Sequence, residues 1–173
     1  DFPKINPVQI AIDPGLPKEK HMRWAALLRH QAPEEAVAIL RQLKLDNDTI
    51  SKAKTLVQWW KRPIGADQTQ IRKTMSQMAP ELYDDLLILK ASVGELELQA
   101  EGCVEDLDWV KAQSGEIRQR GDCVSLKELA VTGADLIQAG MKPGKELGET
   151  LKRLLELVLE HPEWNTKEIL KKV

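Results

Sequence analysis

Residues 131–148 read VTGADLIQAGMKPGKELG, and this stretch places four glycines and one proline between two helical patterns. Backbone geometry must be closely specified where so many glycines gather. The pattern predicts a short helix from Asp135 to Ala139, which Gly140 ends in a left-handed conformation. Pro143 suits the first position of the next helix. We therefore expect a helix-turn-helix corner.

The second half of this corner has a geometry that suits a phosphate group. Gly144 and Gly148 leave the start of the second helix without side-chain bulk. Such a start presents bare N–H groups at the positive end of a helix dipole. The alternative is a tight corner whose glycines serve packing alone, and both interpretations stay open. The residues assigned to the structure of the turn are Gly133, Asp135, Gly140, Pro143 and Gly148.

The glycine motif and its surroundings resemble a known family. The run 129–148, the leucines that follow it and the sequence NTKE at 165–168 resemble the C-terminal part of bacterial CCA-adding enzymes. These are the tRNA nucleotidyltransferases of the poly(A) polymerase superfamily. The segments RWAALL at 23–28 and LLILKA at 86–91 are similar to helices of the same enzymes. The resemblance spans nearly the whole chain past about residue 20.

This resemblance implies an all-helical, RNA-binding body and tail without the catalytic head. The implied partners are tRNA and the head and neck of the parent polypeptide, and a homo-oligomer is also possible. Mg²⁺ and CTP or ATP are expected only in the head, so no cofactor or catalytic residue is expected in this chain. Whether CCA, CC, A or poly(A) is added would be decided there. A helical interaction or dimerisation module derived from such a tail is the alternative function.

Lys145 is where the chain departs from the family, whose members commonly carry Pro-Gly-Pro at this point. A cation at the start of a helix is mildly unfavourable, and a bound phosphate would reverse that penalty. Lys145 is therefore expected to contact RNA together with Lys142 and the N–H groups after Gly144. The alternative is an ordinary surface pair between Lys145 and Glu149, one helical turn apart.

Helical periodicity recurs from residue 17 onward and strand patterns are almost absent, so the expected fold class is all-α. We expect a multi-helix bundle with a smaller C-terminal helical tail. The expected divisions are an extended segment over 1–16, a helical body over 17–121 and a helical tail over 122–173. Residues with N-cap or capping-box chemistry mark several helix starts. They are Asp46 or Asn47, Asp67, Ser125 with Glu128, and Asn165 with Glu168.

Charge is unevenly distributed along the chain, although the net charge is only −2. Residues 17–62 hold 10 basic and 5 acidic side chains, 63–117 hold 4 and 11, and 118–173 hold 10 and 9. Such segregation can orient an RNA even when the whole protein is acidic. The expected basic surface comprises Arg23, Arg29, Arg41, Lys44, Lys52, Lys54, Lys61 and Arg62. Of these, Lys52, Lys54, Lys61 and Arg62 are the predicted RNA contacts.

No constellation of residues indicates catalysis or metal binding. Cys103 and Cys123 lack the spacing of a zinc site and are interpreted as core thiols. The adjacent pairs Asp84-Asp85 and Glu105-Asp106 indicate a solvated acidic face, because neighbours i and i+1 on a helix do not face one another. His30 is interpreted as a cation at a helix end, since three histidines in all cannot build a multi-histidine metal site.

Trp59-Trp60, followed by Lys61-Arg62, is open to two interpretations. The rings could stack on bases beside phosphate-binding charge. Alternatively, because successive helical residues point about 100° apart, one ring joins the core while the other lies half exposed. No apolar run approaches the roughly 20 residues that span a bilayer, and no signal peptide opens the chain. We expect a cytoplasmic protein without a membrane partner, and a first residue other than Met suggests a fragment or a processed form.

Overall fold

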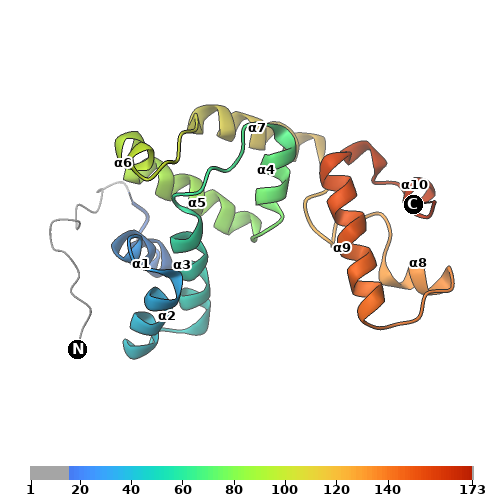
Figure 1. Cartoon of the computed structure of the whole chain (residues 1–173), viewed down its shortest axis with the longest axis horizontal. Coiled ribbons are helices and arrows are strands. Elements are labelled where there is room, and N and C mark those ends of the chain that lie inside the picture. The colour runs from blue at the N-terminus through green and yellow to red at the C-terminus, as the bar shows by residue number, and fades with distance from the viewer. Residues whose placement is uncertain (1–15, 173) are drawn as a thin grey trace. The chain divides into compact units, whose positions relative to one another are not determined.

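The computed structural model describes residues 16–172 and is built from helices (Figure 1). The described range contains ten α-helices, one short 3-10 helix and no strand, which confirms the all-α prediction. None of the helices in this range is both long enough and apolar enough to cross a bilayer. The helices are α1 (Lys20–Leu28), α2 (Pro33–Gln42), α3 (Asn47–Trp59), α4 (Gln68–Met75), α5 (Pro80–Val93), α6 (Glu95–Ala100), α7 (Leu107–Arg120), α8 (Gly133–Gln138), α9 (Lys145–Glu160), η2 (Pro162–Trp164) and α10 (Lys167–Leu170).

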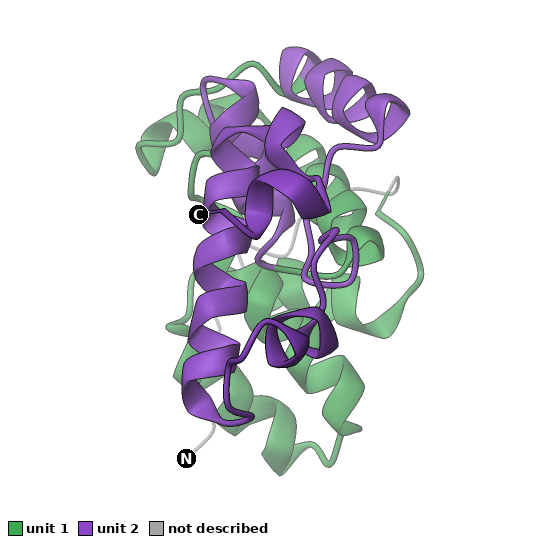
Figure 2. Ribbon diagram, turned by 90° about the vertical axis from the view of Figure 1, so that its right-hand side faces the viewer, with its two compact units in different colours: residues 1–63, 78–107 green, residues 64–77, 108–173 purple. Residues whose placement is uncertain are grey.

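The helices form two compact units, each assembled from segments that are distant in sequence (Figure 2). Unit 1 comprises residues 1–63 and 78–107, and unit 2 comprises 64–77 and 108–173. The limits of these units follow from which residues pack together. The predicted divisions at 17–121 and 122–173 are instead placed at turn residues in the sequence. Those divisions stay a prediction about domains. The predicted extended segment lies outside the described residues except for Leu16, which is buried.

Helix α3 is the centre of unit 1, where it packs against α1, α2 and α5. It begins where Asp46, as predicted, accepts a hydrogen bond from the Thr49 backbone N–H at 2.9 Å. Apolar residues three and four apart then put one face of the helix into the core. The buried residues of that face are Ile50, Ala53, Leu56, Val57 and Trp60. The indole N–H of Trp60 donates to the Arg29 carbonyl at 2.7 Å, which ties α3 to the end of α1.

A buried ion pair that the sequence pattern did not predict lies beneath the end of α3. Lys90 of α5 is 0% exposed, and its ammonium group donates to Glu105 at 2.5 Å. It also donates to the Arg62 carbonyl at 2.7 Å and contacts Cys103 Sγ at 3.3 Å. The prediction of a solvated acidic face is therefore wrong at Glu105, whose side chain is 5% exposed. Its carboxylate is buried because Lys90 brings the opposite charge.

Helix α9 is the centre of unit 2, where it packs against α4, α8 and η2. Its 16 residues carry an apolar stripe, with Leu154 and Val158 buried and Leu147, Leu151 and Leu155 partly buried. Residues from the loops and from the short helices complete the core around this stripe. They are Cys123, Leu129, Val131, Leu136 and Leu170. The short helices are thus held by packing on α9 rather than by their own length.

Unit 2 also buries a cation. The Arg72 guanidinium of α4 donates from Nε to the Leu159 carbonyl at 2.8 Å and from Nη1 to Asp122 at 3.3 Å. Asp122 is also bonded by Nη2 of Arg120 at 2.7 Å. The side chains of Arg72 and Asp122 are only 5% and 7% exposed. Arg72 therefore joins α4 to the last turn of α9 and to the loop after α7.

Candidate nucleic-acid interface

The glycine corner begins with a capping box at α8. The Thr132 hydroxyl accepts from the Asp135 N–H at 3.3 Å, and the Asp135 carboxylate accepts from the Thr132 N–H at 2.9 Å. Lys167 adds an ion pair to Asp135 at 2.9 Å. The hydrogen bonds from Thr132 are the main reason that the pKa of Asp135 lies well below its usual range. The helix therefore starts at Gly133, whereas the predicted start was Asp135. The Thr-x-x-Asp pattern of the capping box is the sequence signal that would have given the correct start.

Gly140 ends α8 as predicted. Its φ of +103° is a conformation that residues with a side chain seldom adopt. The Met141 N–H then donates back to the Leu136 carbonyl at 3.0 Å, which is the hydrogen bond of a Schellman motif. Met141 packs against the apolar core of the unit. The left-handed glycine thus turns the chain and returns an apolar side chain to α9.

The start of α9 differs from the prediction at one residue. Pro143 lies two positions before the helix rather than at its first position, because Gly144 is the N-cap with φ +152° and ψ −161°. Gly148 lies inside α9, one turn from its start. A side chain added at Gly144 or Gly148 would meet nothing within 4 Å, whereas one at Gly133 would touch Leu147 at 3.4 Å. Backbone conformation accounts for glycine at 144, but packing within the chain does not account for glycine at 148.

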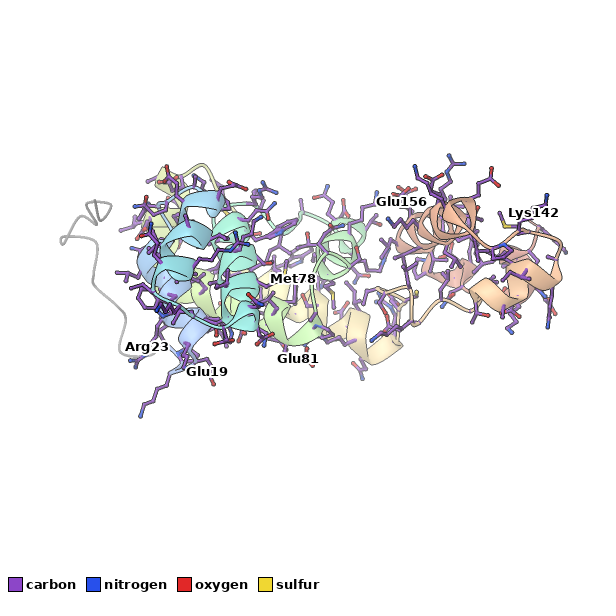
Figure 3. All side chains as sticks on the ribbon, turned by 90° about the horizontal axis from the view of Figure 1, so that it is seen from below. Glu19, Arg23, Met78, Glu81, Lys142 and Glu156 are labelled. Carbon is purple, nitrogen blue, oxygen red and sulfur yellow. The ribbon has the colours of Figure 1, made fainter. Side chains whose placement is uncertain are left out.

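Two lysines flank this helix start, which has no side-chain cap and carries Glu146 in its first turn. Lys142 lies in the turn between α8 and α9 (Figure 3), is exposed and forms no ion pair with a described residue. Lys145 is 90% exposed and pairs with Glu149 at 3.7 Å. The surface pair between Lys145 and Glu149, which was the alternative to an RNA contact, is thus present. A pair so exposed is weak, so the ammonium group stays accessible to an anion.

The segment before the corner is held by a residue with an unexpected role. Asn165 accepts from the Ala130 N–H at 2.7 Å and donates to the Glu128 carbonyl at 3.0 Å. Its predicted role as a helix cap is wrong, because Thr166 caps α10 instead. Ser125 and Glu128 do bond one another at 3.0 Å, but they stabilise a turn and not the start of an α-helix. The Asn165 side chain therefore fixes the backbone that leads into the glycine corner.

The predicted RNA-binding lysines of unit 1 are all ion-paired. Lys52 pairs with Asp48 at 2.7 Å, Lys54 with Glu34 at 3.9 Å and Lys61 with Glu101 at 3.5 Å. Arg62 lies over the Trp59 ring, with its guanidinium carbon 5.3 Å from the ring centroid. The basic surface of unit 1 is thus more compensated by acids than the residue counts indicate.

Other basic residues of unit 1 differ in availability. Arg29 is directed into the unit, where it is 11% exposed and bonds Glu97 at 2.8 Å. By contrast, three further members of the expected surface are exposed and form no ion pair with any residue in the range 16–172. These are Arg23, which is labelled on α1 in Figure 3, and Arg41 and Lys44 around the end of α2. They give this unit charge that no acid of the described chain offsets.

His30 and the cysteines have structural surroundings. His30 bonds Glu97 at 3.0 Å and meets the Trp60 ring edge-on, so its partner is a carboxylate and not the carbonyls of a helix end. Cys103 and Cys123 are buried, as predicted, and burial raises the pKa of both thiols. Within residues 16–172, no group of three or more His, Cys, Asp or Glu side chains is arranged to hold a metal ion.

The described residues form an all-helical protein in which the longest helix, α9, begins at a glycine without a side-chain cap. A family model described as tRNA nucleotidyltransferase domain 2, putative, matches residues 17–173. The chain belongs to this family, which confirms the resemblance to the C-terminal region of CCA-adding enzymes. No match was found among curated proteins or among solved structures.

Proposed function

We propose that this chain is the tRNA-recognising, non-catalytic part of a cytoplasmic CCA-adding nucleotidyltransferase. In this proposal it holds tRNA by shape and by the phosphate backbone, while another part of the parent protein binds Mg²⁺ and CTP or ATP and adds nucleotides. Membership of the tRNA nucleotidyltransferase family supports tRNA as the partner. Double-stranded RNA is generally recognised through its shape, phosphates and 2′-hydroxyls, because its deep major groove is closed to side chains.

The start of α9 is the observation that carries the proposal. Gly144 supplies no side-chain cap, so no hydroxyl or carboxylate of the N-cap covers the first N–H groups of a 16-residue helix. These groups and the helix dipole favour an anion. The exposed ammonium groups of Lys142 and Lys145 lie within three residues of them. A phosphate of the RNA backbone fits this combination of donors and charge.

The paired lysines of unit 1 fit a supporting role. Exposed ion pairs contribute about 0–1 kcal/mol, so Lys52, Lys54 and Lys61 can exchange a carboxylate for a phosphate at little cost. Arg62 is the fourth predicted contact in this unit. These contacts would orient the RNA through charge and would make its binding sensitive to salt.

The test is charge reversal at the corner. Lys142→Glu with Lys145→Glu should weaken tRNA binding at low salt and reduce its dependence on salt by about one unit of slope for each lost phosphate contact. Lys111→Glu is the matched control, because it also reverses the charge of an exposed lysine but lies on α7, away from the glycine corner in the sequence. Binding would be followed by filter retention or fluorescence anisotropy across a salt series.

Two outcomes would overturn parts of this proposal. If the double variant loses less than about twofold in affinity, the corner holds no phosphate and its glycines shape the turn alone. If the unmodified chain binds no tRNA but self-associates as its concentration rises, the alternative of a dimerisation module replaces tRNA recognition. A preserved fold, checked by circular dichroism, keeps either result interpretable.

A further inference from the structure

Trp59 and Arg62 form an accessible aromatic–cation pair at the end of α3. The Arg62 guanidinium carbon lies 5.3 Å from the centre of the Trp59 ring, within the range of a cation–π contact. Trp59 is partly exposed and Arg62 is exposed, whereas Trp60 is entirely buried. The two indoles therefore have the separate environments that helical geometry predicts. The surface pair has no packing role comparable to that of Trp60.

The backbone beneath this pair is held in place by buried groups. The Trp60 indole is bonded to the Arg29 carbonyl, and the Arg62 N–H donates to the Trp59 carbonyl at 3.0 Å. On the next peptide group, the Arg62 carbonyl accepts from the buried Lys90 ammonium at 2.7 Å. The turn that carries Trp59 and Arg62 is thus fixed from inside the unit before any ligand arrives.

The buried Lys90–Glu105 pair holds the turn that carries Trp59 and Arg62 in one conformation. Burying two charges is seldom a net gain in stability over apolar residues of similar size. The ammonium group of Lys90 nevertheless stays in the core, where one of its hydrogen bonds holds the carbonyl of the residue that bears the surface guanidinium. A preorganised site loses less conformational freedom on binding, and that loss is part of the cost of association.

We propose that Trp59 and Arg62 form a stacking site for one unpaired base of the bound RNA. The base stacks on the exposed part of the indole, while Arg62 and its neighbour Lys61 contact the adjoining phosphates. Stacking of bases on aromatic rings is the usual way in which proteins hold single strands, and it tolerates any base. A base within a duplex offers no free face to the ring. This inference rests on the proposed RNA-binding function and adds an unpaired nucleotide to the ligand.

The experiment compares two RNA hairpins that differ only in a short unpaired 3′ tail carrying 2-aminopurine, whose fluorescence falls on stacking. Trp59→Leu should weaken binding of the tailed hairpin by about fivefold or more and abolish the quenching, because base–aromatic stacking contributes at least that much. Trp59→Phe should retain part of both signals. Trp109→Leu removes another exposed indole, in unit 2, and is the matched control. The blunt hairpin should bind all four proteins alike.

The outcomes separate this inference from the proposed function. If the unmodified chain binds both hairpins and Trp59→Leu binds the tailed one unchanged, the stacking site is refuted while RNA binding stands. If Trp59→Leu weakens both hairpins equally, the ring acts on the fold or on the duplex, and the site is again refuted. If the unmodified chain binds neither hairpin, the proposed function fails and the stacking site fails with it.

Discussion

Among residues 16–172, each unit buries one cation at the end of a long helix, and the two cations differ in their burial and in the bonding of their carboxylate partners. Lys90 in unit 1 holds the Arg62 carbonyl beyond α3, and Arg72 in unit 2 holds the Leu159 carbonyl in the last turn of α9. In unit 2 the buried carboxylate Asp122 is also bonded by the exposed Arg120 at 2.7 Å. In unit 1 a fully buried ammonium group serves a carbonyl, a carboxylate and a thiol at once.

The comparison indicates that the buried cation of unit 1 is the more costly one to remove, because Lys90 is fully buried, whereas Asp122 in unit 2 is also bonded by an exposed arginine. Removing one partner of a buried pair is costly mainly because the remaining charge loses its counterpart. Without Lys90, Glu105 loses a cation in a site that is nearly closed to water. Without Arg72, Asp122 keeps Arg120. We therefore expect unit 1 to be the more sensitive unit.

The largest expected effect is that of Lys90→Met. It should lower the free energy of unfolding of unit 1 by about 3–5 kcal/mol, the usual consequence of breaking a buried ion pair. Urea denaturation followed by circular dichroism would measure it. Lys54→Met, which removes an exposed pair in the same unit, should change stability by less than about 1 kcal/mol. Equal effects of the two substitutions would contradict the assignment of Lys90 to a critical buried position.

Arg72→Met should have a smaller effect, a loss of about 1–3 kcal/mol in unit 2, because the Leu159 carbonyl loses its charged donor. The same denaturation experiment applies, with the exposed neighbour Lys73→Met as control. If Arg72→Met proves more damaging than Lys90→Met, the expected greater sensitivity of unit 1 is wrong. If Asp122 depends on both arginines, changing Arg72 and Arg120 together to Met should lower the free energy of unfolding by more than the sum of the two single changes.

Gly148→Ala should raise the stability of unit 2 by roughly 0.5–1 kcal/mol, because glycine is costly inside a helix. The added methyl group has open space around it. Gly115→Ala in α7 meets the same conditions and is the matched control. If an RNA backbone lies against α9 at this point, Gly148→Ala lowers tRNA affinity while Gly115→Ala does not. A stability gain at Gly115 but not at Gly148 would reveal strain in α9 that the contacts do not show.

The smallest expected effect concerns pH and the capping box of α8. Hydrogen bonds from Thr132, followed by Lys167, hold the pKa of Asp135 below its unfolded value of about 3.8. The stability that it contributes is therefore complete at neutral pH and is lost as pH falls through the unfolded pKa toward the folded one. Asp135→Asn should make the stability of unit 2 depend less on pH below about 4. Urea midpoints compared at pH 7 and pH 3 would measure this, and an unchanged pH dependence would argue against the box.

Local features of the fold could be predicted because the responsible residues are close in sequence. Asp46 and Asp67 cap α3 and α4, and Gly140 ends α8, as their side chains or lack of one predict. The opposite environments of Trp59 and Trp60 followed from helical spacing alone. The error at Pro143 was also local, because Gly144 has a conformation that delays the helix by two residues.

Interactions between distant residues could not be predicted in this way. Lys90 inside an apolar run was a signal that a counter-charge must be buried with it, but nothing in the run names Glu105. Asn165 had the pattern of a cap, and only the packing of the C-terminal segment brings it to Ala130. The RNA-contact residues stay predictions, since exposure and charge restrict the choice of contacts without identifying a ligand.

The Arg72–Leu159 hydrogen bond spans 87 positions of the chain, and this separation has a consequence for biosynthesis. Residues 64–77 are synthesised before α9, the helix on which they pack. Domains usually fold as units during synthesis, so α4 has to wait until α9 has been translated. During that interval its apolar face, with Ile71 and Met75, stays uncovered by its final partner. We expect that segment to be the part of the nascent chain with most need of a chaperone.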